Sequence, residues 1–292
     1  MPPVVAALGG FDGLVTPVSL ARDALMTRSV EQQVVSFAAV HEHVKRQYLA
    51  DQWGDFVQRT KKLPSNQGKL TSFLGDLQRA EVTKIFVPKR SFRGLSPGNP
   101  YLKKEPEGTY EEIRPMDLCL RLMSCREQMA EFWVELMPSL SLINQPSENT
   151  TATATASAAN YTGVMVEPTI GTVSRDRQIL LGMATKIATH QMLRELSTRP
   201  SCRHMHEWLS SYLLVQHAID LSERGSVQRL HADLVAQPIC FRGGALVDPL
   251  DLSVELFQRS VEILEQIEED LRLAPEHVVP YTSKFFEDCL LL

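Results

Sequence analysis

The sequence lacks the patterns that mark several classes of protein. No apolar run approaches the roughly 18 residues needed to span a bilayer. Gly-x-Ser-x-Gly, Walker, dinucleotide-binding and His-Glu-x-x-His motifs are absent, as is any Cys-x-x-Cys pair. The start of the chain lacks the basic stretch that is typical of a secretion signal. We therefore expect a soluble, cytoplasmic, non-catalytic protein, with an enzyme of unrecognised helical active site as the open alternative.

The composition is that of an ordinary globular protein. The 292 residues are 43% hydrophobic and 22% charged, which suffices for one large or two ordinary domains. The net charge of −5 favours neither nucleic acid nor an anionic membrane surface as a partner. The cysteines are odd in number and scattered, which is typical of a reduced, intracellular protein. They are Cys119, Cys125, Cys202, Cys240 and Cys289.

Apolar residues recur at steps of three and four, the period of an amphipathic helix. The longest such stretch runs from Ser19 to Leu63, and a capping box at Ser29 and Gln32 predicts a break near residues 27–29. Its stripe consists of Val30, Val34, Phe37, His41, Val44 and Tyr48. On this stripe we interpret His41 as a satisfied core histidine rather than a catalytic base.

Five further segments have the helical period or clear start and stop signals. They cover residues 70–87, 115–138, 174–197, 200–224 and 227–236, with Gly225 closing the fourth. Asp248 and Pro249 then begin a long last helix. Its predicted buried stripe is Leu250, Val254, Phe257, Val261, Leu264, Ile267 and Leu271. The fold class is therefore all-α: a multi-helix bundle with long amphipathic helices and a low-complexity linker.

Two stretches without helical period divide the chain. Residues 145–160 are rich in Ala, Thr and Ser and lack the large apolar groups that offset ordering entropy. They separate an N-terminal helical region, 1–144, from a C-terminal one, 161–275, which a tail of residues 276–292 follows. Within the first region, residues 88–114 read as an irregular loop because they are rich in proline and glycine.

This loop is basic at its start. Residues 84–104 carry six basic side chains and no acid, with Phe86, Phe92 and Tyr101 between them. Basic and aromatic side chains together can grip a phosphate backbone and stack bases, but a solvated loop or a protein-binding loop is the simpler interpretation. The candidate partner-binding residues are Lys89, Arg90, Arg93, Lys103 and Lys104.

The last four residues, Cys289-Leu-Leu-Leu, have the form of a geranylgeranylation box. Cys289 is therefore a candidate lipidation site, and the alternative is an apolar end that folds back on the bundle. No basic run precedes the cysteine, and Glu287 and Asp288 adjoin it. One lipid chain gives only marginal membrane binding, so this hypothesis requires a second contact.

Three potential metal ligands lie close together in the sequence: Cys202, His204 and His206. Two histidines two residues apart do not share a helix face, and no fourth ligand stands out. We therefore assign no metal ion, no cofactor and no catalytic residue. Cys125 lies on an apolar stripe and is interpreted as a small core residue.

The functional hypothesis is a non-catalytic protein-interaction module, a scaffold or complex subunit of a eukaryotic cell. The alternatives are a prenylated adaptor or regulator at the membrane periphery, anchored through Cys289, and a nucleic-acid-binding protein that uses residues 84–104. Protein partners are favoured over nucleic acid because an irregular loop of about 25 residues inside a compact domain is often a binding element.

Overall fold

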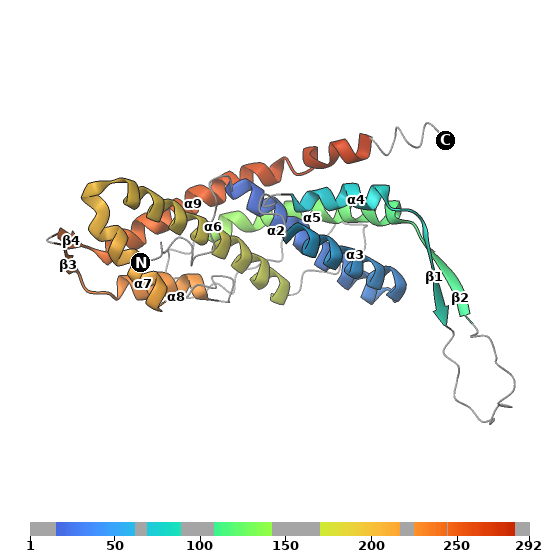
Figure 1. Ribbon diagram of the computed structural model, residues 1–292, viewed down its shortest axis with the longest axis horizontal. Coiled ribbons are helices and arrows are strands. Elements are labelled where there is room, and N and C mark those ends of the chain that lie inside the picture. Colours follow the sequence, from blue (N-terminus) through green and yellow to red (C-terminus); the bar gives the residue numbers. More distant parts are fainter. Residues whose placement is uncertain are drawn as a thin grey trace, which may run out of the picture.

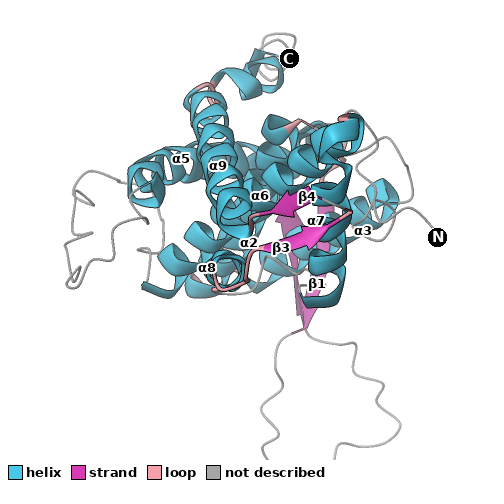
Figure 2. Ribbon diagram, turned by 90° about the vertical axis from the view of Figure 1, so that its left-hand side faces the viewer, coloured by secondary structure: helices cyan, strands magenta, loops and turns pink. Residues whose placement is uncertain are grey.

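The computed structural model describes residues 16–61, 69–88, 108–141, 170–216, 225–243 and 245–283. Helices dominate these residues, and the two sheets among them are two-stranded hairpins (Figures 1 and 2). The predicted all-α, multi-helix fold is confirmed. The low-complexity segment 145–160 lies outside the described residues.

The elements follow one another in a simple order. The helices are α2 (Pro17–Ala39), α3 (His43–Lys61), α4 (Phe73–Arg79), α5 (Pro115–Ser141), α6 (Ile170–Thr198), α7 (Arg203–Gln216), α8 (Ser226–Val235) and α9 (Pro249–Arg272). Single 3₁₀ turns are η1 (Leu70–Ser72), η2 (Pro200–Cys202) and η3 (Glu276–Val278). The strands are β1 (Thr83–Pro88), β2 (Gly108–Ile113), β3 (Cys240–Arg242) and β4 (Ala245–Val247).

The first long stretch is two helices, and the predicted break was in the wrong place. Ser29 is buried within α2, where its hydroxyl donates to the carbonyl of Leu25 at 2.7 Å, so it caps nothing. The chain breaks at His41, which has φ 60°. The amide of Glu42 donates to the carbonyl of Phe37 at 2.9 Å, which completes a Schellman turn around His41. His41 is consequently exposed, and its assignment to the core was wrong.

The predicted helix 70–87 was wrong in its second half. After α4 the chain becomes β1, which pairs antiparallel with β2 from Thr83 opposite Ile113 to Pro88 opposite Gly108. Residues 108–113, predicted as irregular, are therefore a strand. The β-branched and aromatic residues of β1 favour this conformation once a partner strand is present. The hairpin extends away from the helices as an arm (Figure 1).

One helix boundary in the C-terminal half also differs from the prediction. α6 begins at Ile170 rather than at Ser174. Gly225 precedes α8 as its N-cap, with φ 78°; residues 217–224, where the preceding helix was expected to end, lie outside the described residues. The amide of Gly225 donates to the side-chain carbonyl of Gln178 at 3.2 Å, which fixes the start of α8 on α6.

The buried apolar residues form two clusters. One is built from α3, α4 and the first half of α5, and the other from α6, α7, α8, α9 and the second half of α5. α2 contributes Ala21 and Leu25 to the second cluster and Met26, Val30 and Phe37 to the first. α2 and α5 therefore join the two halves of the described chain.

α9 begins as the sequence predicts. The carboxylate of Asp248 accepts a hydrogen bond from the amide of Leu250 at 2.9 Å, and Pro249 occupies the first turn. The guanidinium of Arg259 donates to Glu195 of α6 at 2.9 Å. Figure 2 shows α9 running along the bundle beside α6 and α8, with the β3–β4 hairpin near α7. α9 is thus held at its start and along its length.

Candidate binding groove

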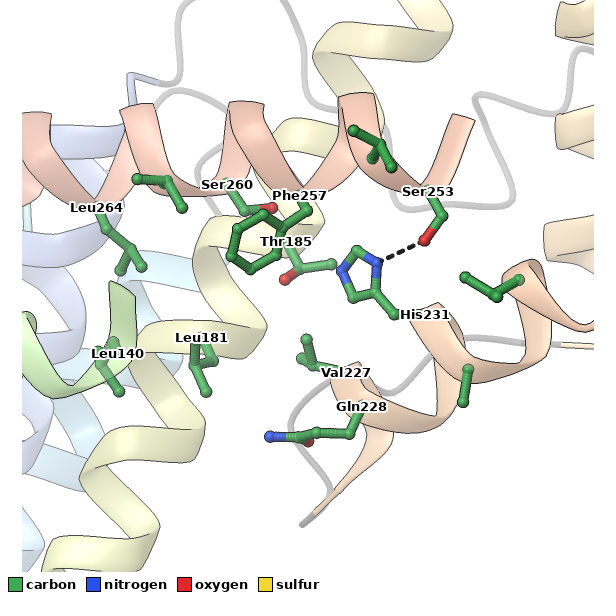
Figure 3. A pocket seen from close by; sticks show the side chains of 14 residues that line it. Leu140, Leu181, Thr185, Val227, Gln228, His231, Ser253, Phe257, Ser260 and Leu264 are labelled. Carbon is green, nitrogen blue, oxygen red and sulfur yellow. Dashed lines mark hydrogen bonds between the residues drawn. The ribbon is translucent and has the colours of Figure 1, made fainter. Parts of the chain in front are cut away.

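A groove lies between α8 and α9 and reaches α6 and the end of α5; we call it the α8–α9 groove (Figure 3). Its volume is about 590 Å³. Most of its wall is apolar, and its apolar lining residues include Val227 and Val235 of α8 and Val254, Phe257, Val261 and Leu264 of α9. Apolar cavities of about 300–1,000 Å³ with a few polar groups are typical of binding sites.

The groove exists because α9 carries more apolar surface than the bundle covers. Leu264, Ile267 and Leu271 of the predicted stripe are buried, as expected. Leu250 and Val254, however, are each 49% exposed, so the prediction was wrong for the first half of α9. The core there is formed by Leu252, Leu256 and Ile263 instead. Val254, Phe257 and Val261 of the predicted stripe line the groove, whereas Leu250 does not.

One polar pair lies near the start of α9. Nδ1 of His231 is 3.1 Å from the hydroxyl of Ser253, and the imidazole edge packs against Phe257 with ring centroids 6.0 Å apart (Figure 3). Burial lowers the pKa of His231, so the ring is neutral at pH 7. The groove therefore combines an apolar wall with one uncharged hydrogen-bonding pair. Sequence reasoning missed both residues, since α8 and α9 meet only in the fold.

A second, polar cavity of about 390 Å³ lies at the base of the β1–β2 arm. All of its charged side chains except that of Asp117 are paired. Lys45 and Arg121 both contact Glu42, at 2.7 and 3.3 Å, and Arg114 contacts Glu112 at 2.8 Å. This arrangement offers a ligand little uncompensated charge, and we assign it a structural role.

A buried charged cluster holds the segment after α9 to the bundle. Nε of Arg22 donates to Asp270 at 3.0 Å, and Nη1 of Arg126 donates to the carbonyl of Ala274 at 2.9 Å. Nε2 of His277 lies 2.9 Å from Arg22. Burial, together with Arg22, lowers the pKa of His277. Nε of Arg126 is buried without a hydrogen-bond partner. The cluster links α2 and α5 to α9 and to the segment that follows it.

The structure describes only some of the residues that the sequence analysis singled out. The side chains Lys89, Arg90, Arg93, Lys103 and Lys104, like Cys289, lie outside the described residues. Cys125 is a core residue, as predicted, and burial raises the pKa of its thiol to about 12.

The Cys202–His206 segment spans η2 and the start of α7. Across the described ranges, no three His, Cys, Asp or Glu side chains are grouped so that they could hold a metal ion.

Comparison with protein-family models, curated proteins and solved structures finds no match. None of the described helices is long and apolar enough to cross a membrane.

Proposed function

We propose that the protein is an interaction module, a scaffold or complex subunit, that receives the apolar face of a partner helix in the α8–α9 groove. The observation that supports this is the half-exposed apolar stripe of α9 above a cavity of about 590 Å³. Amphipathic helices bind grooves of this kind through apolar residues at every third or fourth position.

The dimensions fit such a partner. From Val254 to Leu264 the groove wall extends about 15 Å at about 1.5 Å per residue, or nearly three helical turns. A partner helix of that length presents three or four apolar anchors. The two walls are also preformed, because α9 is tied to Glu195 of α6 through Arg259 and α8 is tied to Gln178 through Gly225. Preformed walls reduce the entropy lost on binding.

Designed peptides test the proposal. The probes are fluorescent peptides of about 18 residues, long enough to form helix, that share one Leu-rich face and differ in the side chains flanking it. The assay is fluorescence anisotropy with the full chain. We expect at least one peptide to bind, and we expect Val254→Asn to weaken its binding about tenfold.

The matched control is Val35→Asn. Val35 is 52% exposed on α2 and Val254 is 49% exposed on α9, so the two substitutions make similar changes to exposed helical valines. We expect Val35→Asn to leave peptide affinity unchanged. If no peptide binds, or if both variants weaken binding equally, the helix-in-groove proposal is wrong.

A further inference from the structure

A row of carboxylates borders the α8–α9 groove. Glu262 and Glu265 follow the groove residues Val261 and Leu264 on α9, and Asp251 lies one turn before Val254. All three acidic side chains are exposed. At 3.6 residues per turn they lie on the solvent side of the apolar stripe. A helix in the groove would pass beside them.

These three acids differ from two other acids of α9, whose charge is compensated within the helix. Glu255 and Glu268 are neutralised by Arg259 and Arg272 one turn later. Within the described part of the chain, no basic side chain contacts the three acids of the row. The opposite wall, formed by Gln228, Ala232 and Val235 of α8, has no charged lining residue. Beside it α8 exposes one base and one acid, Arg229 and Asp233, so the net negative charge at the border of the groove comes from α9.

We infer that the partner helix is basic, with Lys or Arg along the flank that meets the acidic row of α9. This inference rests on the proposed function, because it specifies the partner of the same groove. Complementary charge favours encounter and fixes the orientation of the partner, whereas an acidic helix would place like charges side by side. The same charge disfavours fatty acids and other anionic amphiphiles as occupants.

The expected effect is moderate because the carboxylates are exposed. Exposed ion pairs contribute little each, so three of them together should change affinity about tenfold, which corresponds to about 1.4 kcal/mol. Salt should reduce the difference, because the Debye length falls from roughly 10 Å at 0.1 M to roughly 3 Å at 1 M ionic strength.

The test uses three peptides with the same apolar face and flanks of Lys, Gln or Glu. Their affinities for the full chain are measured at low and high salt. We expect the order Lys, Gln, Glu, with about tenfold between first and last at low salt. Binding without charge preference, or with Glu preferred, would overturn the inference but leave the helix-in-groove proposal standing. If none binds, the proposed function itself fails.

Charge reversal on the protein completes the test. Glu262→Lys combined with Glu265→Lys should abolish or reverse the order of the peptides. The control combines Asp55→Lys with Glu81→Lys, which makes the same change in net charge at two exposed acids in α3 and after α4. It should keep the order.

A different occupant would give a different result. A second copy of this chain would appear as a dimer that Val254→Asn dissociates, and that result would overturn the inference of a basic helical partner.

Discussion

Arg28 and Asp176 form an ion pair at the contact between α2 and α6. Removing either partner alone should lower the free energy of unfolding. Nε of Arg28 donates to Oδ1 of Asp176 at 2.6 Å, and Nη2 donates to Oδ2 at 3.2 Å. Their side chains are 6% and 2% exposed. Glu31, 37% exposed, is a second carboxylate partner of Arg28.

This geometry predicts an asymmetry between the two single substitutions. Arg28→Met leaves a buried carboxylate without its counter-ion and should lower the free energy of unfolding by about 3–5 kcal/mol. Asp176→Asn leaves Arg28 with Glu31, so its cost should be smaller, about 1–3 kcal/mol. Replacing both residues, with Arg28→Met and Asp176→Leu, removes both buried charges. The double variant should recover much of the loss, since apolar pairs often match buried ion pairs in stability.

The assay is urea unfolding monitored by far-UV circular dichroism. The dependence of the free energy of unfolding on urea concentration should be the same in all variants. Arg59→Met is the control, because Arg59 makes an exposed 3.6 Å contact with Asp76 and its loss should change stability by less than about 1 kcal/mol. A loss below about 1 kcal/mol for Arg28→Met would show that water compensates Asp176 and would refute the reasoning.

Three further predictions concern other parts of the chain. Burial lowers the pKa of His190, His231 and His277. The unfolded chain therefore takes up protons near pH 6.5, where the folded chain does not. The free energy of unfolding should consequently fall as the pH decreases below about 6.5. Thermal unfolding between pH 7.5 and 5.5 checks this, and His277→Gln should reduce the dependence; a melting temperature that rises on acidification would contradict it. Phe37→Ala empties a fully buried site and should lower the free energy of unfolding in urea by about 3–5 kcal/mol. A loss under about 1 kcal/mol would show that Phe37 is not in the core. Gly108→Ala should speed amide hydrogen exchange in β1 and β2, because a Cβ there would lie 2.6 Å from the carbonyl oxygen of Val87. The urea midpoint should stay the same because the arm packs little against the bundle. Unchanged exchange would refute the described pairing of β1 with β2.

Local signals in the sequence predicted the elements that local interactions determine. The Asp248 cap and the helix that begins at Pro115 were read correctly because both depend on residues within one or two turns. The turn at His41 was missed because a histidine occupies the left-handed position where glycine is usual. The apolar residues of β1 fit a helical period, and only pairing with a strand some twenty-five residues away makes them a hairpin.

The candidate groove was beyond prediction for a related reason. Eight of the fifteen residues from Leu250 to Leu264 are apolar, and they lie on several faces of α9, so more than one face fits a buried stripe. Which face is buried depends on the position of α6 and α8. The unoccupied face, and the meeting of His231 with Ser253, follow from that packing alone.

The claim that the α8–α9 groove binds a helix is tested most directly by methyl NMR. Protein labelled at Val and Leu methyl groups is titrated with the Lys-flanked peptide. The account predicts that resonances of Val254, Val261 and Leu264 shift first and saturate together, while those of Val35 stay in place. Shifts confined to the arm, at Val82 and Val87, or spread evenly over the molecule, would contradict it.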